Sequence, residues 1–164
     1  MLAMIYIQPT HDERMRIRYT IAKLQTLKHV LLKLISIMDE MVNGVYERDL
    51  KSSLLCFVLA INQCRQHVQT SIDAMEHLFP LNHLNSEKTI EEETLKFNSA
   101  FECANHYEKK IVKSFRDILN DYHVLPEIRS QMQAQLNEIF YGFLKLKLVG
   151  SFSFRKTARF KHLF

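Results

Sequence analysis

The sequence predicts an all-α protein: an antiparallel up-down-up-down four-helix bundle with a short N-terminal arm and a basic, aromatic C-terminal tail. Large apolar side chains recur at steps of three and four residues along four long segments, the spacing that gathers them on one helix face. The 164 residues include only three Gly and three Pro, which leaves few places for turns. Four helices with short links bury such stripes most simply as antiparallel neighbours.

The first helix is expected over residues 11–46, after an arm that ends at Pro9. Thr10 and Glu13 have the spacing of a capping box, in which the hydroxyl and the carboxylate each accept from a backbone amide of the first turn. Gly44 is expected to weaken the last turn. The apolar stripe is uninterrupted: Ile17, Ile21, Leu24, Leu27, Leu31, Ile35, Met38 and Val42.

The second helix is expected over residues 49–79, with Asp49 as its N-cap and Pro80 as its stop. One position of its stripe is polar, because Arg65 stands where an apolar residue belongs. The other members are Leu54, Val58, Ile61, Val68, Ile72, Met75 and Phe79.

The third helix is expected over residues 89–121, opened by a second capping box formed by Thr89 and Glu92. Asn105 and Glu108 interrupt its apolar stripe at the centre. The large members are Phe97, Phe101, Val112, Phe115, Leu119 and Tyr122.

The fourth helix is expected over residues 126–149, with Pro126 as its first residue and Gly150 as its end. Its stripe is apolar except at Gln135: Ile128, Met132, Ile139, Phe143 and Leu146. The four helices form one predicted domain, residues 1–149, and the tail is residues 150–164.

The polar positions within the stripes predict a buried polar layer, made of Arg65, Asn105, Glu108 and Gln135. A buried carboxylate costs several kcal/mol unless a partner is supplied. Counting residues along an antiparallel pair places Arg65 and Glu108 within reach of each other. The alternative is that the third stripe is rotated by one position, which leaves Arg65 and Glu108 at a wet edge and puts Ala104 inside.

The run ECANHYEKKIVKSFRDIL, followed by LPEIRSQMQAQL, resembles the third and fourth helices of a bacterial family of ferritin-like four-helix bundles of unknown function. The family's aromatic-Arg-Asp segment matches Phe115, Arg116 and Asp117, and its Leu-Pro matches Leu125 and Pro126. The inward Arg65 and the Gln-containing last helix also fit. The resemblance covers about residues 30–145 and implies a ferritin-like fold.

The chain departs from that family where the family is acidic, because Asn105, Glu108 and Lys109 leave only one carboxylate. Ferritin-like di-metal sites use a Glu from each of two helices and a Glu-x-x-His from each of the other two. No Glu-x-x-His occurs in this sequence. The weak metal candidates are therefore Glu108 and the pair Glu102 and His106 on the third helix, with His67 on the second.

The last twenty residues hold six Lys or Arg and no acid, although the whole chain carries a net charge of only +4. Cations beside aromatic rings suit nucleic acid or an anionic membrane surface. The alternatives are an extended arm that docks on its own bundle or on a second copy, and contact with another protein. The residues are Lys145, Lys147, Phe152, Phe154, Arg155, Lys156, Arg159, Phe160 and Lys161.

The composition favours a cytoplasmic, noncatalytic protein without a cofactor. Cys56, Cys64 and Cys103 lie in helix-like segments without metal-type spacing, as reduced core thiols do. No run reaches the roughly 20 apolar residues that span a bilayer, and no catalytic motif is present. We expect association with a second copy, as a dimer, or with a protein partner. The alternatives are a metal-binding or redox bundle with iron or manganese, and a nucleic-acid-binding accessory protein.

Overall fold

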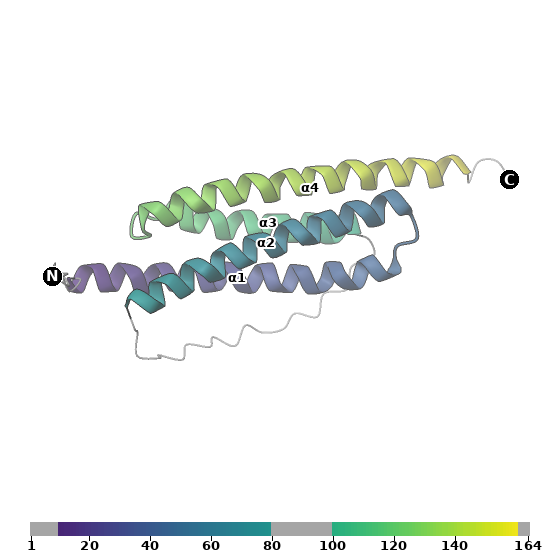
Figure 1. The fold of residues 1–164 in the computed structure, drawn as a ribbon. Coiled ribbons are helices and arrows are strands. Elements are labelled where there is room, and N and C mark those ends of the chain that lie inside the picture. The colour runs from purple at the N-terminus through teal and green to yellow at the C-terminus, as the bar shows by residue number, and fades with distance from the viewer. Residues whose placement is uncertain (1–9, 80–99, 161–164) are drawn as a thin grey trace.

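A computed structural model describes residues 10–79 and 100–160, and these residues form four α-helices and no strand (Figure 1). This confirms the predicted all-α class for the described part of the chain. The helices are α1 (His11–Gly44), α2 (Arg48–Leu78), α3 (Ala100–Leu119) and α4 (Pro126–Phe160). None of them combines the length and the apolar composition that crossing a bilayer requires.

The start of α1 confirms the first capping box. Thr10 Oγ1 accepts a hydrogen bond from the Glu13 amide at 3.3 Å, and Glu13 Oε2 accepts one from the Thr10 amide at 2.7 Å. The N-cap predicted for α2 was wrong, because Glu47 holds that position and Asp49 lies in the first turn. In the first turn, the Asp49 carboxylate still complements the positive end of the helix dipole. The second predicted capping box lies outside the described residues.

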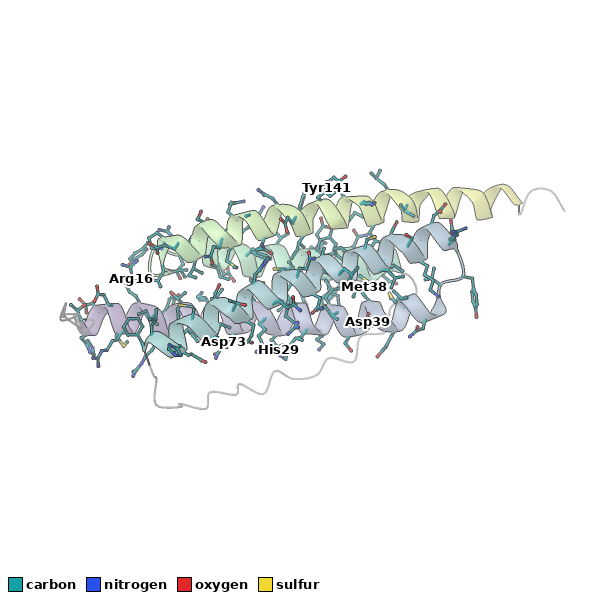
Figure 2. The ribbon with its side chains drawn as sticks, viewed as in Figure 1. Arg16, His29, Met38, Asp39, Asp73 and Tyr141 are labelled. Carbon is teal, nitrogen blue, oxygen red and sulfur yellow. The ribbon has the colours of Figure 1, made fainter. Side chains whose placement is uncertain are left out.

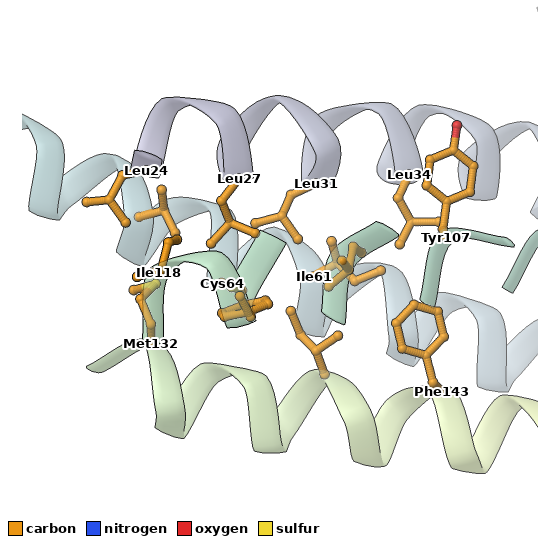
Figure 3. Packing of buried hydrophobic residues seen from close by; sticks show 14 of the residues in the cluster. Leu24, Leu27, Leu31, Leu34, Ile61, Cys64, Tyr107, Ile118, Met132 and Phe143 are labelled. Atoms are coloured by element: carbon orange, nitrogen blue, oxygen red, sulfur yellow. The ribbon is translucent and has the colours of Figure 1, made fainter. Parts of the chain in front are cut away.

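Each helix of the bundle packs against two others. α1 contacts α2 and α3, and α4 contacts the same two helices, so α1 lies diagonally across from α4 and α2 lies diagonally across from α3. Side chains from all four helices meet along the centre (Figure 3). The apolar stripes are therefore buried by two interfaces each, as a bundle requires.

The order of helix directions is up-down-down-up, which corrects the predicted up-down-up-down order (Figure 1). Ser71 near the end of α2 contacts Gln131 near the start of α4, and Phe57 packs against Phe143, so α2 and α4 are antiparallel. α2 ends and α3 begins at opposite ends of the bundle. The prediction failed because it assumed a short link between these two helices, and a short link can join only antiparallel neighbours.

The last helix continues through Gly150 to Phe160, where an end at Val149 and a separate tail were predicted. A single interior glycine costs a helix only about 1 kcal/mol, and no proline follows it. The Leu125 amide donates to Thr20 Oγ1, which sets the start of α4 beside the third turn of α1. Its 35 residues therefore carry α4 past the α1–α2 turn (Figure 1).

Candidate functional site

The predicted pair between Arg65 and Glu108 does not form. The Arg65 side chain is half-buried, and its Nε donates to Asn62 Oδ1 at 3.0 Å, one turn earlier in α2. Glu108 accepts a hydrogen bond from Lys147 of α4 instead. Because α2 and α3 are diagonal, the two predicted partners belong to different interfaces.

The buried stripe of α3 is rotated by one residue from the one first predicted, which contained Asn105 and Glu108. The alternative prediction, with Ala104 inside, is the one observed. Ala104 is fully buried, and Asn105 is only half-buried. Gln135 is likewise half-buried on α4. The predicted polar layer is therefore replaced by an apolar core, and its members lie along the edges of helix interfaces.

The weak metal candidates are divided between the two diagonal helices. His67 is exposed on α2, whereas Glu102, His106 and Glu108 are on α3. Across residues 10–79 and 100–160, no three or more His, Cys, Asp or Glu side chains are grouped so that they could hold a metal ion.

The three cysteines are all free thiols in two environments. Burial raises the pKa of Cys64 and of Cys103 to about 12, and the nearby charge of Glu138 adds to the effect at Cys64. Both therefore stay protonated and unreactive at neutral pH. Cys56 is exposed, which corrects the expectation that all three belong to the core.

A polar corner, which the sequence did not predict, joins α1 to the α3–α4 connection. The Tyr19 hydroxyl donates to Asp121 Oδ2 at 2.5 Å, and the His123 amide donates to Asp121 Oδ1 at 3.0 Å. Lys23 Nζ stands 3.8 Å from Asp121 Oδ2. The hydrogen bond from Tyr19, followed by the one from the His123 amide, lowers the pKa of Asp121 below its ordinary value.

The same corner holds the backbone of the connection. Arg16 donates to the carbonyl oxygens of Tyr122 and His123 at 3.3 and 3.4 Å. Thr20, which is fully buried, accepts from the Leu125 amide at 3.3 Å. Together these hydrogen bonds hold α1 against the α3–α4 connection. In the sequence, the sign of this contact is an aspartate just past a helix end, a position that favours a local turn.

Replacing Asp121 with asparagine is expected to lower the free energy of unfolding at pH 7 by about 1–2 kcal/mol, because the amide offers one neutral acceptor oxygen where the carboxylate offers two charged ones. The folded-state pKa of Asp121 is lowered. Its contribution is therefore present above the ordinary value of 3.8 and is lost as the pH falls through the folded-state value. Urea unfolding at pH 7 and at successively lower pH values checks this, because the advantage of the wild type should shrink steadily once the pH falls below 3.8. Asp117→Asn on the exposed side of α3 is the control, and a wild-type advantage over Asp121→Asn that persists at low pH contradicts the account.

The outer face of α4 carries a row of exposed apolar side chains. Phe140, Tyr141, Leu144 and Leu148 are 44, 71, 47 and 59% exposed. Figure 2 shows Tyr141 on the side of α4 that points away from the other helices. We call these four residues the α4 row.

The α4 row lies opposite the buried stripe of the same helix, to which Ile139, Phe143 and Leu146 belong. A helix in a bundle can bury only one face in the core, so the apolar side chains on its opposite face stay exposed in a single copy of the chain. The run FYGFLKLKL carries the signal in the sequence, because its large apolar residues fall on two faces of a helix, of which only the core face was predicted.

Two of the basic residues predicted for a partner have different surroundings. Lys147 is engaged with Glu108, whereas Lys145 is exposed beside the α4 row. The row and its flanking charges lie on the outer face of α4, where they are accessible to another molecule. Comparisons with family models, with curated proteins and with solved structures give no match for this chain.

Proposed function

We propose that this chain is a noncatalytic four-helix bundle that works by association through the α4 row, with a second copy of itself as the first partner. The observation that carries the proposal is the exposure of four large apolar side chains on one helix face. Clustered exposed apolar surface is characteristic of interaction sites, whereas single exposed residues need no explanation. Binding of another protein through the same face is the alternative occupant.

The connectivity supports a ferritin-like origin for the bundle. Ferritin-like bundles contain one long crossover connection, and the up-down-down-up order requires one between α2 and α3. The centre of the bundle is filled by buried apolar residues such as Leu31, Ile61 and Ile111. We therefore propose a ferritin-like bundle without the metal centre. The alternative function, a bundle that binds iron or manganese, would depend on the few metal-ligating side chains of α3, which are Glu102, His106 and Glu108.

The three free thiols support a reducing compartment such as the cytoplasm. A second candidate function is nucleic-acid binding, which is favoured by the projection of α4 past the α1–α2 turn. The projecting end bears Arg155, Lys156 and Arg159. Binding of this kind would weaken steeply with salt.

Sedimentation velocity over a range of protein concentrations tests the association. The variant Tyr141→Gln/Leu144→Gln is expected to remain monomeric where the wild type forms a larger species, because glutamine keeps helix propensity and removes apolar area. Leu55→Gln/Leu59→Gln is the matched control, since these α2 side chains are 46 and 62% exposed. If wild type, row variant and control sediment alike, the proposed function is wrong.

A further inference from the structure

Two opposite charges flank the α4 row on one side. Glu138 and Lys145 are both exposed, and they are seven residues apart. Seven residues are about two helical turns, so the two side chains lie on the same flank of the helix. The flank faces α2, because Glu138 is close enough to Cys64 for its charge to act on that thiol.

Neither of these charges is used within the described residues. Ion pairs within the described residues include those of Asp121 with Lys23 and His123, and that of Glu108 with Lys147. Lys147, only two residues beyond Lys145, is thus engaged inside the bundle. Glu138 and Lys145 remain available to another molecule.

The placement of the two charges is self-complementary in one orientation only. When two copies of a helix pack antiparallel, residues of the same flank face each other, whereas parallel packing sets opposite flanks together. A two-fold axis that passes between residues 141 and 142 places residue 138 of each copy opposite residue 145 of the other. An interface of this kind is isologous, so each favourable pair occurs twice.

We infer that two copies of this chain pair antiparallel through the α4 row, with Glu138 of each copy facing Lys145 of the other. The inference rests on the proposed function, in which the α4 row is the association surface. Tyr141, Leu144 and Leu148 are spaced by three and four residues, as in the seam of a coiled coil. Tyr141 and Leu144 of the two copies meet about the two-fold axis and form the apolar centre of the interface, and Leu148 lies about 10 Å along the helix from the axis.

The projecting ends of α4 favour the same orientation. Arg155, Lys156 and Arg159 follow one another with no acidic residue between them. In a parallel pair these clusters would lie side by side and repel each other. In the antiparallel pair, residues 156 of the two copies are about 29 residues apart along the axis, or about 40 Å. This distance exceeds the Debye length of about 8 Å at physiological salt, so the repulsion is screened.

The proposed interface is small, so we expect a weak dimer in which the charge pairs contribute mainly to specificity. A seam of about two turns buries less than the ~800 Å² per partner of a standard stable interface. We therefore expect a concentration-dependent dimer, in which the charge pairs select the partner and its orientation more than they add affinity.

Charge reversal tests the arrangement by sedimentation equilibrium at low salt. Glu138→Lys and Lys145→Glu are each expected to weaken the dimer about tenfold, because two attractive pairs become two repulsive ones. The double variant Glu138→Lys/Lys145→Glu is expected to regain the wild-type dissociation constant within about twofold. Thermal unfolding of all three checks that the exposed changes leave the fold intact.

The outcomes separate the inference from the proposed function. The antiparallel arrangement is overturned if the single reversals leave the dissociation constant unchanged, or if the double variant shows the sum of the two losses of affinity. In either case, the α4 row remains the association surface if Tyr141→Gln/Leu144→Gln still abolishes the dimer. A wild type that is monomeric throughout overturns both. As a second readout in a Cys56→Ser background, Tyr141→Cys beside the two-fold axis should form an intermolecular disulfide on oxidation. Gln133→Cys, about 12 Å along the helix from the axis, should not. The reverse pattern overturns the inference.

Discussion

Replacing Phe143 with alanine is expected to lower the free energy of unfolding by about 3–5 kcal/mol. The Phe143 side chain is fully buried, and its ring centroid lies 4.7 Å from that of Phe57 at an interplanar angle of 59°. Removal of the ring takes away this contact and leaves a cavity between α2 and α4. The surrounding structure relaxes only partly around a cavity of this kind, so we expect most of the penalty to remain. Urea unfolding followed by circular dichroism measures it.

Phe140→Ala is the matched control, because it removes the same side chain from the same helix three residues earlier. Phe140 is 44% exposed, so its loss creates no closed cavity and should cost less than about 1 kcal/mol. The control is measured at a protein concentration low enough to keep the chain monomeric. Similar losses for the two variants would show that α4 presents a different face to the core.

Gly142→Ala is expected to destabilise the protein by about 1–3 kcal/mol, against the ordinary helix preference for alanine. A Cβ at residue 142 would stand 2.7 Å from Cδ2 and 3.0 Å from Cε2 of Phe57. The Phe57 ring is 3% exposed and is held against Phe143, so it has no room to retreat. The glycine allows α2 and α4 to approach closely at this level.

Gly44→Ala, at the end of α1, is expected to stabilise the protein. No atom beyond the local backbone lies within 4 Å of a Cβ there, so alanine should raise stability by up to about 1 kcal/mol. Both glycine variants are compared by the midpoint of urea unfolding. If Gly142→Ala is as stabilising as Gly44→Ala, the close approach of the Phe57 ring is wrong.

The existence and the type of α1, α2 and α4 could be predicted from the sequence, because the 3.6-residue period is a local property. The capping box at Thr10 fixed one boundary for the same reason. The direction of α3 could not be predicted in this way. It depends on where the chain emerges after α2, and a stripe of apolar residues is the same when it is read in either direction.

The face of α3 was misassigned because two stripes compete on this helix. Ile111 and Val112 are adjacent, as are Ile118 and Leu119, so both stripes contain large apolar residues. The buried stripe also includes Ala104, whose small side chain allows neighbouring helices to approach but adds little to a hydrophobicity count. The choice between the stripes is made by the packing of neighbouring helices, which a single-helix pattern does not contain.

The α4 row was missed for a related reason. Phe140 and Phe143 are the same residue type three positions apart, and only the presence of neighbouring helices makes one of them core and the other surface. Sequence spacing shows that a helix has two apolar faces. The arrangement of the bundle decides which of them remains uncovered.

The crossover between α2 and α3 has a consequence for how the chain folds. α1 with α2, and α3 with α4, form two hairpins from residues close in sequence, and such contacts form early and fast. The interfaces of α2 with α4 and of α1 with α3 join residues that are far apart in the chain. Neither hairpin can bury its apolar stripes alone, so we expect the encounter of the two hairpins to be the step that sets the folding rate.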